Sequence, residues 1–266
     1  MPAADGVDTR VYADTPDIVQ SLLKLLFWIA LPLTIAGWWQ KDNFVAHIVT
    51  PTALNEDPVQ REVSEQPFKV EYNDTGYVVQ PRHEYDLTGM VVSYRYHDGD
   101  RMLHQIWNDH LNVADVCVVW GRNAHELDLN LFDFFNGQFT CNISTHDRVA
   151  WNQFQMRELS NNHLVSDDPH LRDRITSLKV GDIIRVRGWL SHYGLEGSPH
   201  MRKTSVTRED TGNGACETIF VREFEVLRSM PNRWRDVFGL AGTVLLLVCG
   251  VWLWGTGTGK FSHRAA

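Results

Sequence analysis

Two apolar segments, one toward each end of the chain, most constrain what this sequence can fold into. The first, at 22–39, reads LLKLLFWIALPLTIAGWW with one charge, and the second, at 237–254, reads VFGLAGTVLLLVCGVWLW with none. As a helix each would be about 27 Å long, near the lower limit for crossing the hydrocarbon core of a membrane. Each segment ends in tryptophans, which favour the interfacial depth. We therefore predict two membrane-spanning helices, in preference to two helices buried in a soluble core.

The tail before the first segment argues against a cleaved signal peptide. Residues 1–21 carry four aspartates against one arginine, whereas a signal peptide begins with a short basic region. Thr15 and Pro16 resemble a helix start, with a capping hydroxyl followed by proline in the first turn. We expect an uncleaved anchor.

Two spans place both tails on one side of the membrane and the intervening domain on the other. Basic residues near the spans are evenly divided between the sides, and long domains cross regardless of charge. Short tails with a large translocated domain fit a hairpin anchor, so we predict an extracytoplasmic middle domain. The predicted segments are an N-terminal tail at 1–21, a span at 22–39, a linker and hairpin at 40–84, a β domain at 85–227, a connector at 228–236, a span at 237–254 and a C-terminal tail at 255–266.

Charge and cysteine content narrow the possible partners. The net charge of −8 disfavours a nucleic-acid partner, because phosphates repel an acidic surface. Cys249 lies in the second predicted span, which leaves Cys117, Cys141 and Cys216 without any CxxC spacing. They allow either one disulfide with a free thiol or three buried reduced thiols. We predict no cofactor.

Residue alternation predicts a succession of strands in the middle of the chain. A hairpin is expected around the turn NDTG at 73–76. In the segment 100–112, Leu103, Ile106, Trp107 and Leu111 share one helical stripe. The other elements are expected at 85–95 (strand), 114–120 (strand), 139–144 (strand), 149–154 (a further sheet segment), 169–178 (helix, capped by Asp168 or Ser166), 183–190 (strand) and 218–227 (strand).

This order predicts a mainly β (α+β) domain of the OB-like small-barrel type at 85–227, flanked by the two spans. In OB barrels a helix lies between the third and fourth strands and the first strand is strongly curved. Gly89 inside the first predicted strand is typical of a bulge or bend. The turn at Gly181 and Asp182, followed by an alternating strand with Gly188 inside it, resembles the fourth OB strand. The helix at 100–112 would be an insertion. Another small β-barrel or an α+β sandwich stays open.

Several stretches also resemble a known family. TGMVVSYRYH, DHLNVADVCVVWG, SNNHL and TREDTGNGACETIFV are similar to sequences of uncharacterised, membrane-anchored bacterial envelope proteins. The resemblance implies an inner-membrane protein with an envelope domain. It implies no reaction and no active site.

The stretch TREDTGNGACETIFV at 207–221 contains the most conspicuous catalytic candidates. Asp210 begins an Asp-Thr-Gly triplet of the kind found in aspartic proteases, but charged residues precede it where those enzymes have apolar ones. Cys216 could be a nucleophile if a histidine lay beside it. We favour a structural turn, because Gly212 and Gly214 permit positive φ there.

Histidines are the candidate metal ligands, and His97, His110 and His163 are considered first. His104 and His110 are six residues apart on the predicted helix, so they point apart. His97 with His110 forms a pair only if strand and helix meet, and His192 is a further loose candidate. For each histidine we favour a structural or solvent-facing role over a zinc site.

A mixed basic and aromatic surface is the candidate partner site. Its members are Arg185, Arg187, Trp189, Arg202, Lys203 and Arg208. OB folds bind ligands with such mixtures. In an acidic, membrane-anchored protein we expect membrane lipids or other envelope proteins as partners.

The sequence as a whole favours a non-catalytic, membrane-anchored scaffold or accessory subunit of a bacterial envelope assembly. The alternative is an envelope hydrolase that uses Cys216 or a histidine-bound metal. A third possibility, an OB domain that carries haem, needs an exposed histidine at a flexible end of the barrel. Spatial arrangement decides: the hydrolase needs a histidine within hydrogen-bond reach of Cys216, or two or more converging histidines.

Overall fold

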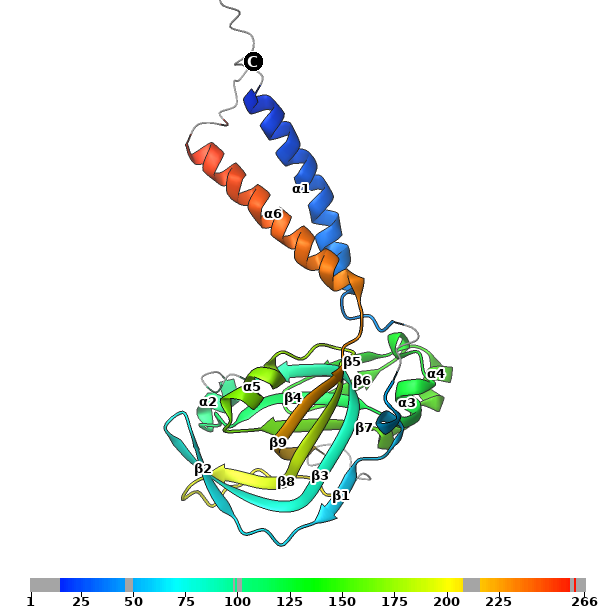
Figure 1. Cartoon of the computed structure of the whole chain (residues 1–266), viewed down its shortest axis with the longest axis vertical. Coiled ribbons are helices and arrows are strands. Elements are labelled where there is room, and N and C mark those ends of the chain that lie inside the picture. The colour runs from blue at the N-terminus through cyan, green and yellow to red at the C-terminus, as the bar shows by residue number, and fades with distance from the viewer. Residues whose placement is uncertain are drawn as a thin grey trace, which may run out of the picture. The chain divides into compact units, whose positions relative to one another are not determined.

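The structure is a computed structural model that describes residues 15–45, 50–97, 99, 102–207, 216–258 and 261. The chain divides into two compact units (Figure 1). One unit consists of the described residues of Met1–Asn43 and Asn232–Ala266, and the other is the middle domain, Phe44–Pro231. The described part is a mixed α/β structure with a large sheet and two long apolar helices.

The two long helices are α1 (Thr15–Gln40) and α6 (Arg233–Gly257), and both are long and apolar enough to cross a membrane. They pack on each other, and a Cβ at Gly37 would lie 2.9 Å from the backbone of Phe238. Glycine therefore permits the close approach of the helices at this point. Many of their apolar side chains are exposed, as is Leu246 at 76 %, which is the pattern of helices that face lipid.

Asn232 ties the adjacent ends of the two helices together. Its Oδ1 accepts a hydrogen bond from the Trp234 N–H at 2.9 Å and so caps α6. Its Nδ2 lies within 3.0 Å of the carbonyl oxygens of Gln40, Lys41 and Asn43, at the end of α1. One buried amide side chain therefore links the start of α6 to the end of α1 through hydrogen bonds to backbone groups of both.

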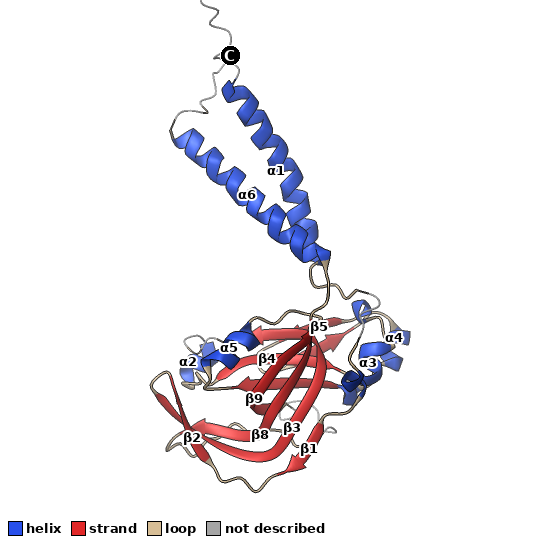
Figure 2. Ribbon diagram, in the orientation of Figure 1, coloured by secondary structure: helices blue, strands red, loops and turns tan. Residues whose placement is uncertain are grey.

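The middle domain is built on a seven-stranded sheet (Figure 2). Its described strands are β1 (Val59–Glu62), β2 (Phe68–Tyr72), β3 (Thr75–Tyr96), β4 (Asn112–Val119), β7 (Leu159–Val165), β8 (Ile183–Leu195) and β9 (Glu217–Arg228). β3 pairs with β4, β4 with β7, β7 with β9, β9 with β8, and β8 returns to β3. Only the β7–β9 pairing in this circuit of described strands is parallel. β1 and β2 extend the sheet from β3.

β3 and β8 are the long strands whose irregularities allow the sheet to bend. The register of β3 shifts between Pro81 and His83 and again between Val91 and Ser93. Gly89 itself pairs regularly with β8, and a Cβ there would meet Val118 at 2.8 Å. The bulge therefore lies beyond the predicted glycine, which instead makes room for a core side chain.

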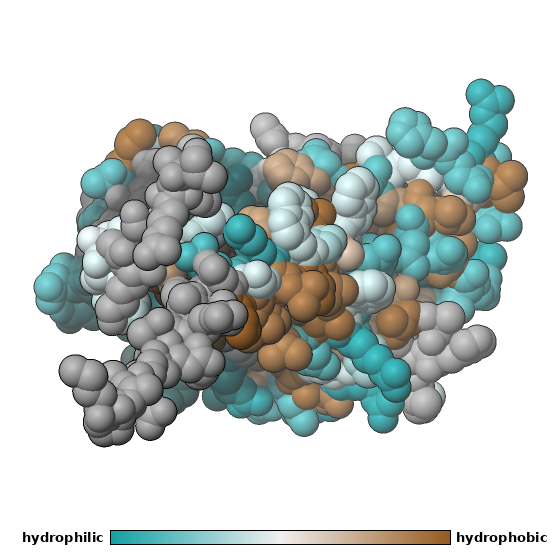
Figure 3. All heavy atoms as spheres, turned by 90° about the horizontal axis from the view of Figure 1, so that it is seen from above, coloured by the Kyte–Doolittle hydropathy of each residue, from teal (hydrophilic) through white to brown (hydrophobic). Residues whose placement is uncertain are grey.

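Short elements complete the domain between the main strands. β5 (Asp133–Asn136) and β6 (Cys141–Ser144) form a separate two-stranded sheet. The described helices and 3-10 turns are η2 (Thr52–Asn55), α2 (Met102–Ile106), α3 (Gly121–His125), η3 (Leu129–Leu131), α4 (Arg148–Gln153), η4 (Met156–Glu158) and α5 (Pro169–Thr176). The core buries Leu87 and Phe224 of the sheet, Trp120 directly after β4, and Ile175 of α5. Figure 3 shows the whole chain from above, with hydrophobic side chains exposed among hydrophilic ones on the face toward the viewer.

Several predicted elements correspond closely to those observed. The hairpin is present, with Asn73 and Asp74 at positive φ in the turn between β2 and β3. α5 begins at Pro169, and the Asp168 side chain accepts hydrogen bonds from the backbone N–H groups of His170 and Leu171. β8 and β9 include the strands predicted at 183–190 and 218–227.

The prediction of the third main strand is wrong. The segment at 139–144 contributes β6 to the small sheet, and β7, with the sequence LSNNHLV, takes its place in the main sheet. β7 lacks the apolar alternation that marks a strand. Its buried polar side chains are instead satisfied by one another and by their neighbours, as when Ser160 donates to Glu217 Oε2 at 2.6 Å.

Three other segments also differ from prediction. The segment at 149–154 is no sheet strand but lies in α4, because Asp147 caps that helix by accepting from the N–H groups of Val149 and Ala150. The first main strand begins at Thr75, ten residues earlier than Tyr85, so the hairpin and this strand are continuous. The helix predicted at 100–112 is short, because Asn108 adopts a positive φ of 50°.

A disulfide joins Cys117 of β4 to Cys141 of β6, with Cα atoms 5.8 Å apart. Cys216 and Cys249 are free thiols. The chain therefore follows the first of the two cysteine alternatives, one disulfide with a free thiol in the middle domain. The bridge holds the small sheet against the main one.

Candidate ligand pocket

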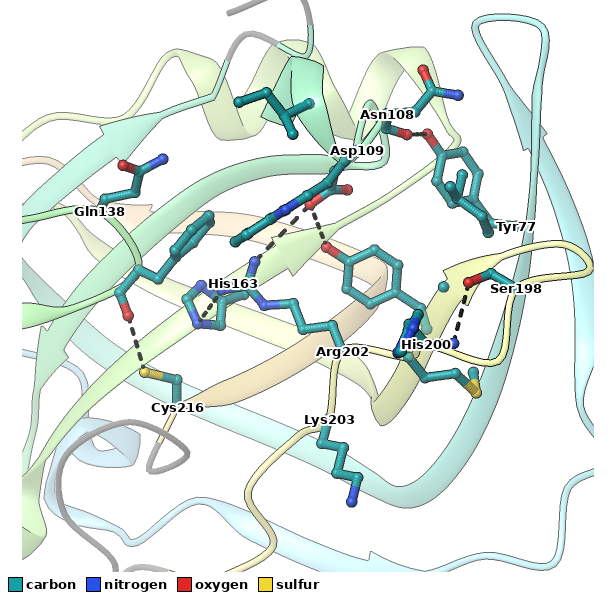
Figure 4. Close-up of a pocket in the computed structure, with 17 residues that line it drawn as sticks. Tyr77, Asn108, Asp109, Gln138, His163, Ser198, His200, Arg202, Lys203 and Cys216 are labelled. Carbon is teal, nitrogen blue, oxygen red and sulfur yellow. Dashed lines mark hydrogen bonds and ion pairs between the residues drawn. The ribbon is translucent and has the colours of Figure 1, made fainter. Parts of the chain in front are cut away.

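A cavity of about 860 Å³ opens in the middle domain, and we call it the Arg202 pocket (Figure 4). Its wall comes from the start of β3, the connection between α2 and β4, the turn between β5 and β6, β7, the end of β8 with the loop after it, and the start of β9. Segments far apart in the sequence therefore meet around one cavity. Its volume is within the range of sites that enclose small organic ligands.

A buried carboxylate with two imidazoles lies behind the pocket wall. Asp115 of β4 is fully buried, and its Oδ1 accepts a hydrogen bond from Nδ1 of His163 on the neighbouring β7. His97 Nε2 lies 3.0 Å from the same oxygen. Burial by itself would raise the pKa of Asp115, but the hydrogen bond with His163 above all, with a smaller effect of His97, outweighs it and lowers that pKa. Asp115 is therefore an ionised carboxylate, and its hydrogen bond orients the His163 ring.

On the pocket side, Arg202 contacts the His163 ring. Its guanidinium lies with one terminal nitrogen 2.9 Å from His163 Nε2 and with Cζ 4.2 Å from the centre of the Phe139 ring. Because guanidinium only donates, Nε2 accepts and the His163 proton is on Nδ1, facing Asp115. Burial lowers the pKa of His163 against the opposing effect of Asp115, and Arg202 lowers it further. The imidazole is accordingly neutral at neutral pH.

A second buried carboxylate, Asp109, lies on another part of the wall. Its Oδ2 accepts a hydrogen bond from the Tyr193 hydroxyl at 2.8 Å, and His104 Nδ1 and Arg202 lie 3.4 Å and 4.0 Å from it. Burial would raise the pKa of Asp109, but hydrogen bonds with His104 and Tyr193 lower it overall. Burial, followed by the Asp109 charge, raises the pKa of Tyr193 well above its usual value. Tyr193 is thus a fixed hydroxyl donor.

The Cys216 thiol faces this pocket, yet its partners are not those of a nucleophile. Its Sγ donates to the Phe139 carbonyl at 3.4 Å and accepts from Asn161 Nδ2 at 3.4 Å. Burial is the largest cause of a raised pKa for this thiol. Among the described residues no histidine hydrogen-bonds to it. Asp210, the other catalytic candidate, lies outside the described residues.

The histidine candidates separate into two groups. His97 and His163 converge on Asp115, whereas His110 lies apart, with Nε2 2.8 Å from Asn108 Oδ1. His104, which the helical stripe excluded, is buried with its ring centroid 4.0 Å from that of His97. Within the described ranges no group of three or more His, Cys, Asp or Glu residues is arranged to hold a metal ion.

The predicted apolar stripe at 100–112 holds only in part, because Leu111 is buried while two of its other members are exposed. Ile106 and Trp107 face the pocket and are exposed, while His104 is buried. A helix only five residues long does not sustain the period on which that reading depended. Exposed apolar residues beside buried polar ones are the signal that marks a binding wall.

The basic surface does not form one site. Arg185 and Arg187 of β8 both pair with Asp86, which lowers the pKa of Asp86 through the Arg185 hydrogen bond above all. Trp189 packs against Phe68 and Phe220. Arg202 and Lys203 both line the pocket, and Figure 4 shows the Arg202 side chain near His163. Arg208 lies outside the described residues.

Comparison with known proteins adds no relative. No protein-family model matches the chain, and neither a curated protein nor a solved structure matches it. The function is therefore argued from the pocket and from the two candidate membrane-spanning helices alone.

Proposed function

We propose that this chain is a non-catalytic, membrane-anchored accessory subunit of a bacterial envelope assembly, whose middle domain holds a ligand or a group of a partner in the Arg202 pocket. One observation carries the proposal. The pocket is large enough for an organic ligand, while the groups that could attack or deprotonate one are engaged with each other. Such a wall binds and orients a molecule without transforming it.

An OB-like barrel is the finer architecture that we propose for the middle domain. The circuit of pairings from β3 through β4, β7, β9 and β8 back to β3 supports it, as does the parallel pairing of β7 with β9. α5 lies between β7 and β8, the third and fourth of these five strands in chain order, where OB barrels have a helix. OB domains commonly serve as binding modules, which agrees with the pocket.

An extracytoplasmic position of the middle domain, at a bacterial inner membrane, completes the proposal. The Cys117–Cys141 disulfide supports it, because disulfides persist in oxidising compartments such as the periplasm. The two candidate spans support anchoring from both ends of the domain. Helical spans are the architecture of inner membranes, whereas outer-membrane proteins are typically closed barrels.

A hydrolase is the alternative, and the contacts of its two key groups argue against it. The Cys216 thiol donates to a carbonyl and has a raised pKa, so little of it is thiolate at neutral pH. The basic nitrogen of His163 already accepts from Arg202. A general base must reach the proton that it removes, and this nitrogen faces a cation instead.

The test of the proposal is to identify the molecules that stay bound to the protein after detergent extraction from the membrane. Tagged full-length protein would be purified in mild detergent as wild type, Gln138→Trp and Gln153→Trp. Gln138 lies on the pocket wall, so an indole there occupies part of the cavity. Gln153, at the exposed end of α4, receives the same indole outside the pocket lining. Native mass spectrometry and protein identification would then compare what each variant retains.

We expect a small molecule or a partner protein that is retained by wild type and Gln153→Trp and depleted at least ~10-fold from Gln138→Trp, since a blocked site loses most of its affinity. Matching thermal unfolding midpoints would show that Gln138→Trp is folded. Equal retention by all three proteins, or recovery of the wild type alone in several detergents, would contradict the proposal.

A further inference from the structure

We infer that the Arg202 pocket takes an organic anion with an apolar body, such as an aromatic carboxylate or a phosphate monoester. This inference rests on the proposed role of the pocket as a binding site and adds the chemical class of its occupant. Three features support it: a cation without a close counter-ion, an apolar wall beside that cation, and a volume that holds both ends of such a molecule.

Arg202 is a largely buried cation with unused donors. Its side chain is 21 % exposed, yet a guanidinium presents five N–H donors. Within the described part of the chain, its side chain makes one hydrogen bond, to His163 Nε2, and one long ion pair, to Asp109 Oδ2 at 4.0 Å. The remaining donors are available to an acceptor in the cavity. Oxyanions are the strongest acceptors for a guanidinium, often through two parallel hydrogen bonds.

Asp109 does not act as the close counter-ion of Arg202. Its Oδ2 already accepts the Tyr193 hydroxyl at 2.8 Å, and its Oδ1 accepts the backbone N–H of Asn112 at 3.4 Å. The charge-bearing contact to Arg202 is longer than a hydrogen bond. His163 contributes an acceptor nitrogen but no negative charge. A buried cation in this setting is stabilised by an incoming anion, since burying a charge is costly unless it is paired.

The wall beside Arg202 suits an apolar body. Ile106, Trp107, Phe139, Leu195 and Met201 line the pocket. The Trp107 side chain is half exposed although it borders a cavity, and Ile106 is exposed at 73 %. Covering these side chains with an apolar molecule removes them from water, which favours binding. The pocket therefore favours an amphiphilic anion over a bare inorganic one.

Lys179 provides a matched control for the charge of Arg202. Each of the two residues carries one positive charge. Arg202 lines the pocket, where Figure 4 shows its side chain near His163, whereas Lys179 is exposed and lies outside the pocket lining. Replacing either by glutamine changes the net charge equally, so a difference between the variants reports contact with the ligand and not the general field.

The experiment uses full-length protein in phosphatidylcholine nanodiscs and isothermal titration calorimetry. The probes are 2-naphthoate and 2-naphthamide, which share a flat apolar body and differ in charge. We expect 2-naphthoate to bind the wild type and Lys179→Gln alike, and to bind Arg202→Gln about tenfold more weakly, the loss typical of a charge-assisted hydrogen bond. The amide should bind weakly and equally to all three.

Two results would overturn the inference. One is equal affinity of wild type for 2-naphthoate and 2-naphthamide, and the other is equal loss of 2-naphthoate affinity in Arg202→Gln and Lys179→Gln. If Arg202→Gln proves misfolded by circular dichroism, the comparison of the two probes on the wild type still decides the question. If Gln138→Trp loses the component that the wild type retains, but the wild type does not bind 2-naphthoate, the proposed function stands and only the inference of an anionic ligand is refuted.

The same chemistry occurs in soluble organic acids and in anionic lipid headgroups, and a second arm separates these sources. The titration with 2-naphthoate would be repeated in nanodiscs that contain phosphatidylglycerol. A lipid source is indicated if phosphatidylglycerol lowers the apparent affinity of wild type for 2-naphthoate. In Gln138→Trp, whose affinity is already reduced, the same lipid should cause no further loss. An unchanged affinity indicates a soluble source. Both results agree with an anion site.

Discussion

His163 is a neutral imidazole held between a carboxylate and a guanidinium, and this setting makes the stability of the middle domain depend on pH. Its pKa in the folded protein is lowered by burial, from about 6.5 in an unfolded chain. Below that value the unfolded chain binds more protons than the folded one, so the free energy of unfolding falls as pH falls. We expect a loss of up to about 1.4 kcal/mol per pH unit from this group between pH 6.5 and its folded pKa.

The measurement is urea unfolding of the full chain at pH 7.5, 6.5 and 5.5, in wild type and in His163→Asn. Asparagine keeps an N–H donor for Asp115 near the position of Nδ1 but does not titrate. The free energy of unfolding of His163→Asn should therefore depend less steeply on pH than that of wild type. His192, whose pKa burial also lowers, maintains a residual slope in both proteins. His110→Asn is the matched control at a half-buried position, where the ring contacts Asn108 and not Asp115. Equal slopes in wild type and His163→Asn would refute the assignment.

At the scale of elements, Asn232 determines how the ends of α1 and α6 are joined. Replacing it with alanine removes both the helix cap and the amide that faces three carbonyl groups. Loss of a cap alone costs about 1 kcal/mol, and buried acceptors without partners add to the cost. In Asn232→Ala we expect amide hydrogen exchange in the first turn of α6 to accelerate on the order of tenfold, measured by mass spectrometry.

Asn232→Asp separates the two roles of this side chain. The carboxylate keeps the oxygen that caps α6 but cannot donate to the carbonyls at the end of α1. Exchange in the first turn of α6 should then stay near that of wild type, while the amides near Lys41 and Asn43 exchange faster. Unchanged exchange in both variants would show that the amide is dispensable.

Elements with a clear period and a local cap could be predicted from the sequence. The two long apolar helices, the hairpin at 73–76 and α5 with Asp168 all depend on neighbouring residues. β7 could not be found this way, because its polar side chains are buried by partners from distant segments. Asn161, for instance, accepts from Asn136, which in turn accepts from Ser93. Such long-range hydrogen bonds leave no trace in local hydropathy.

The site was predictable only in fragments for the same reason. His97, His163, Arg202 and Cys216 were named from their residue types, but their common location was not. Asp115 and His163 pair because β4 and β7 are adjacent in register, across 48 positions of sequence. Arg202 reaches His163 because the loop after β8 folds back, with backbone hydrogen bonds between Arg202 and Tyr193. Topology brings the residues together.

At the scale of the whole molecule, the disulfide and the two candidate membrane-spanning helices bear on the cellular compartment in which the middle domain lies. In an oxidising compartment Cys117 and Cys141 stay bridged while Cys216 and Cys249 stay free. A bridge across 24 residues stabilises the folded state by about 3 kcal/mol in the chain-entropy view. We therefore expect the Cys117→Ala, Cys141→Ala double variant to unfold at lower urea concentration than Cys216→Ala, the matched control that removes a free thiol.

The redox state can be read in the cell that makes the protein. Membranes would be treated in denaturant with a mass-tagged maleimide, before and after reduction, and the tags on the full chain counted. For an extracytoplasmic domain we expect two tagged cysteines before reduction and four after it, and one and three in Cys216→Ala. Four tags before reduction would place the domain in a reducing compartment, because cytosolic thiols are kept reduced. That result would leave the pocket unchanged but would move any ligand of Arg202 to the cytosolic side.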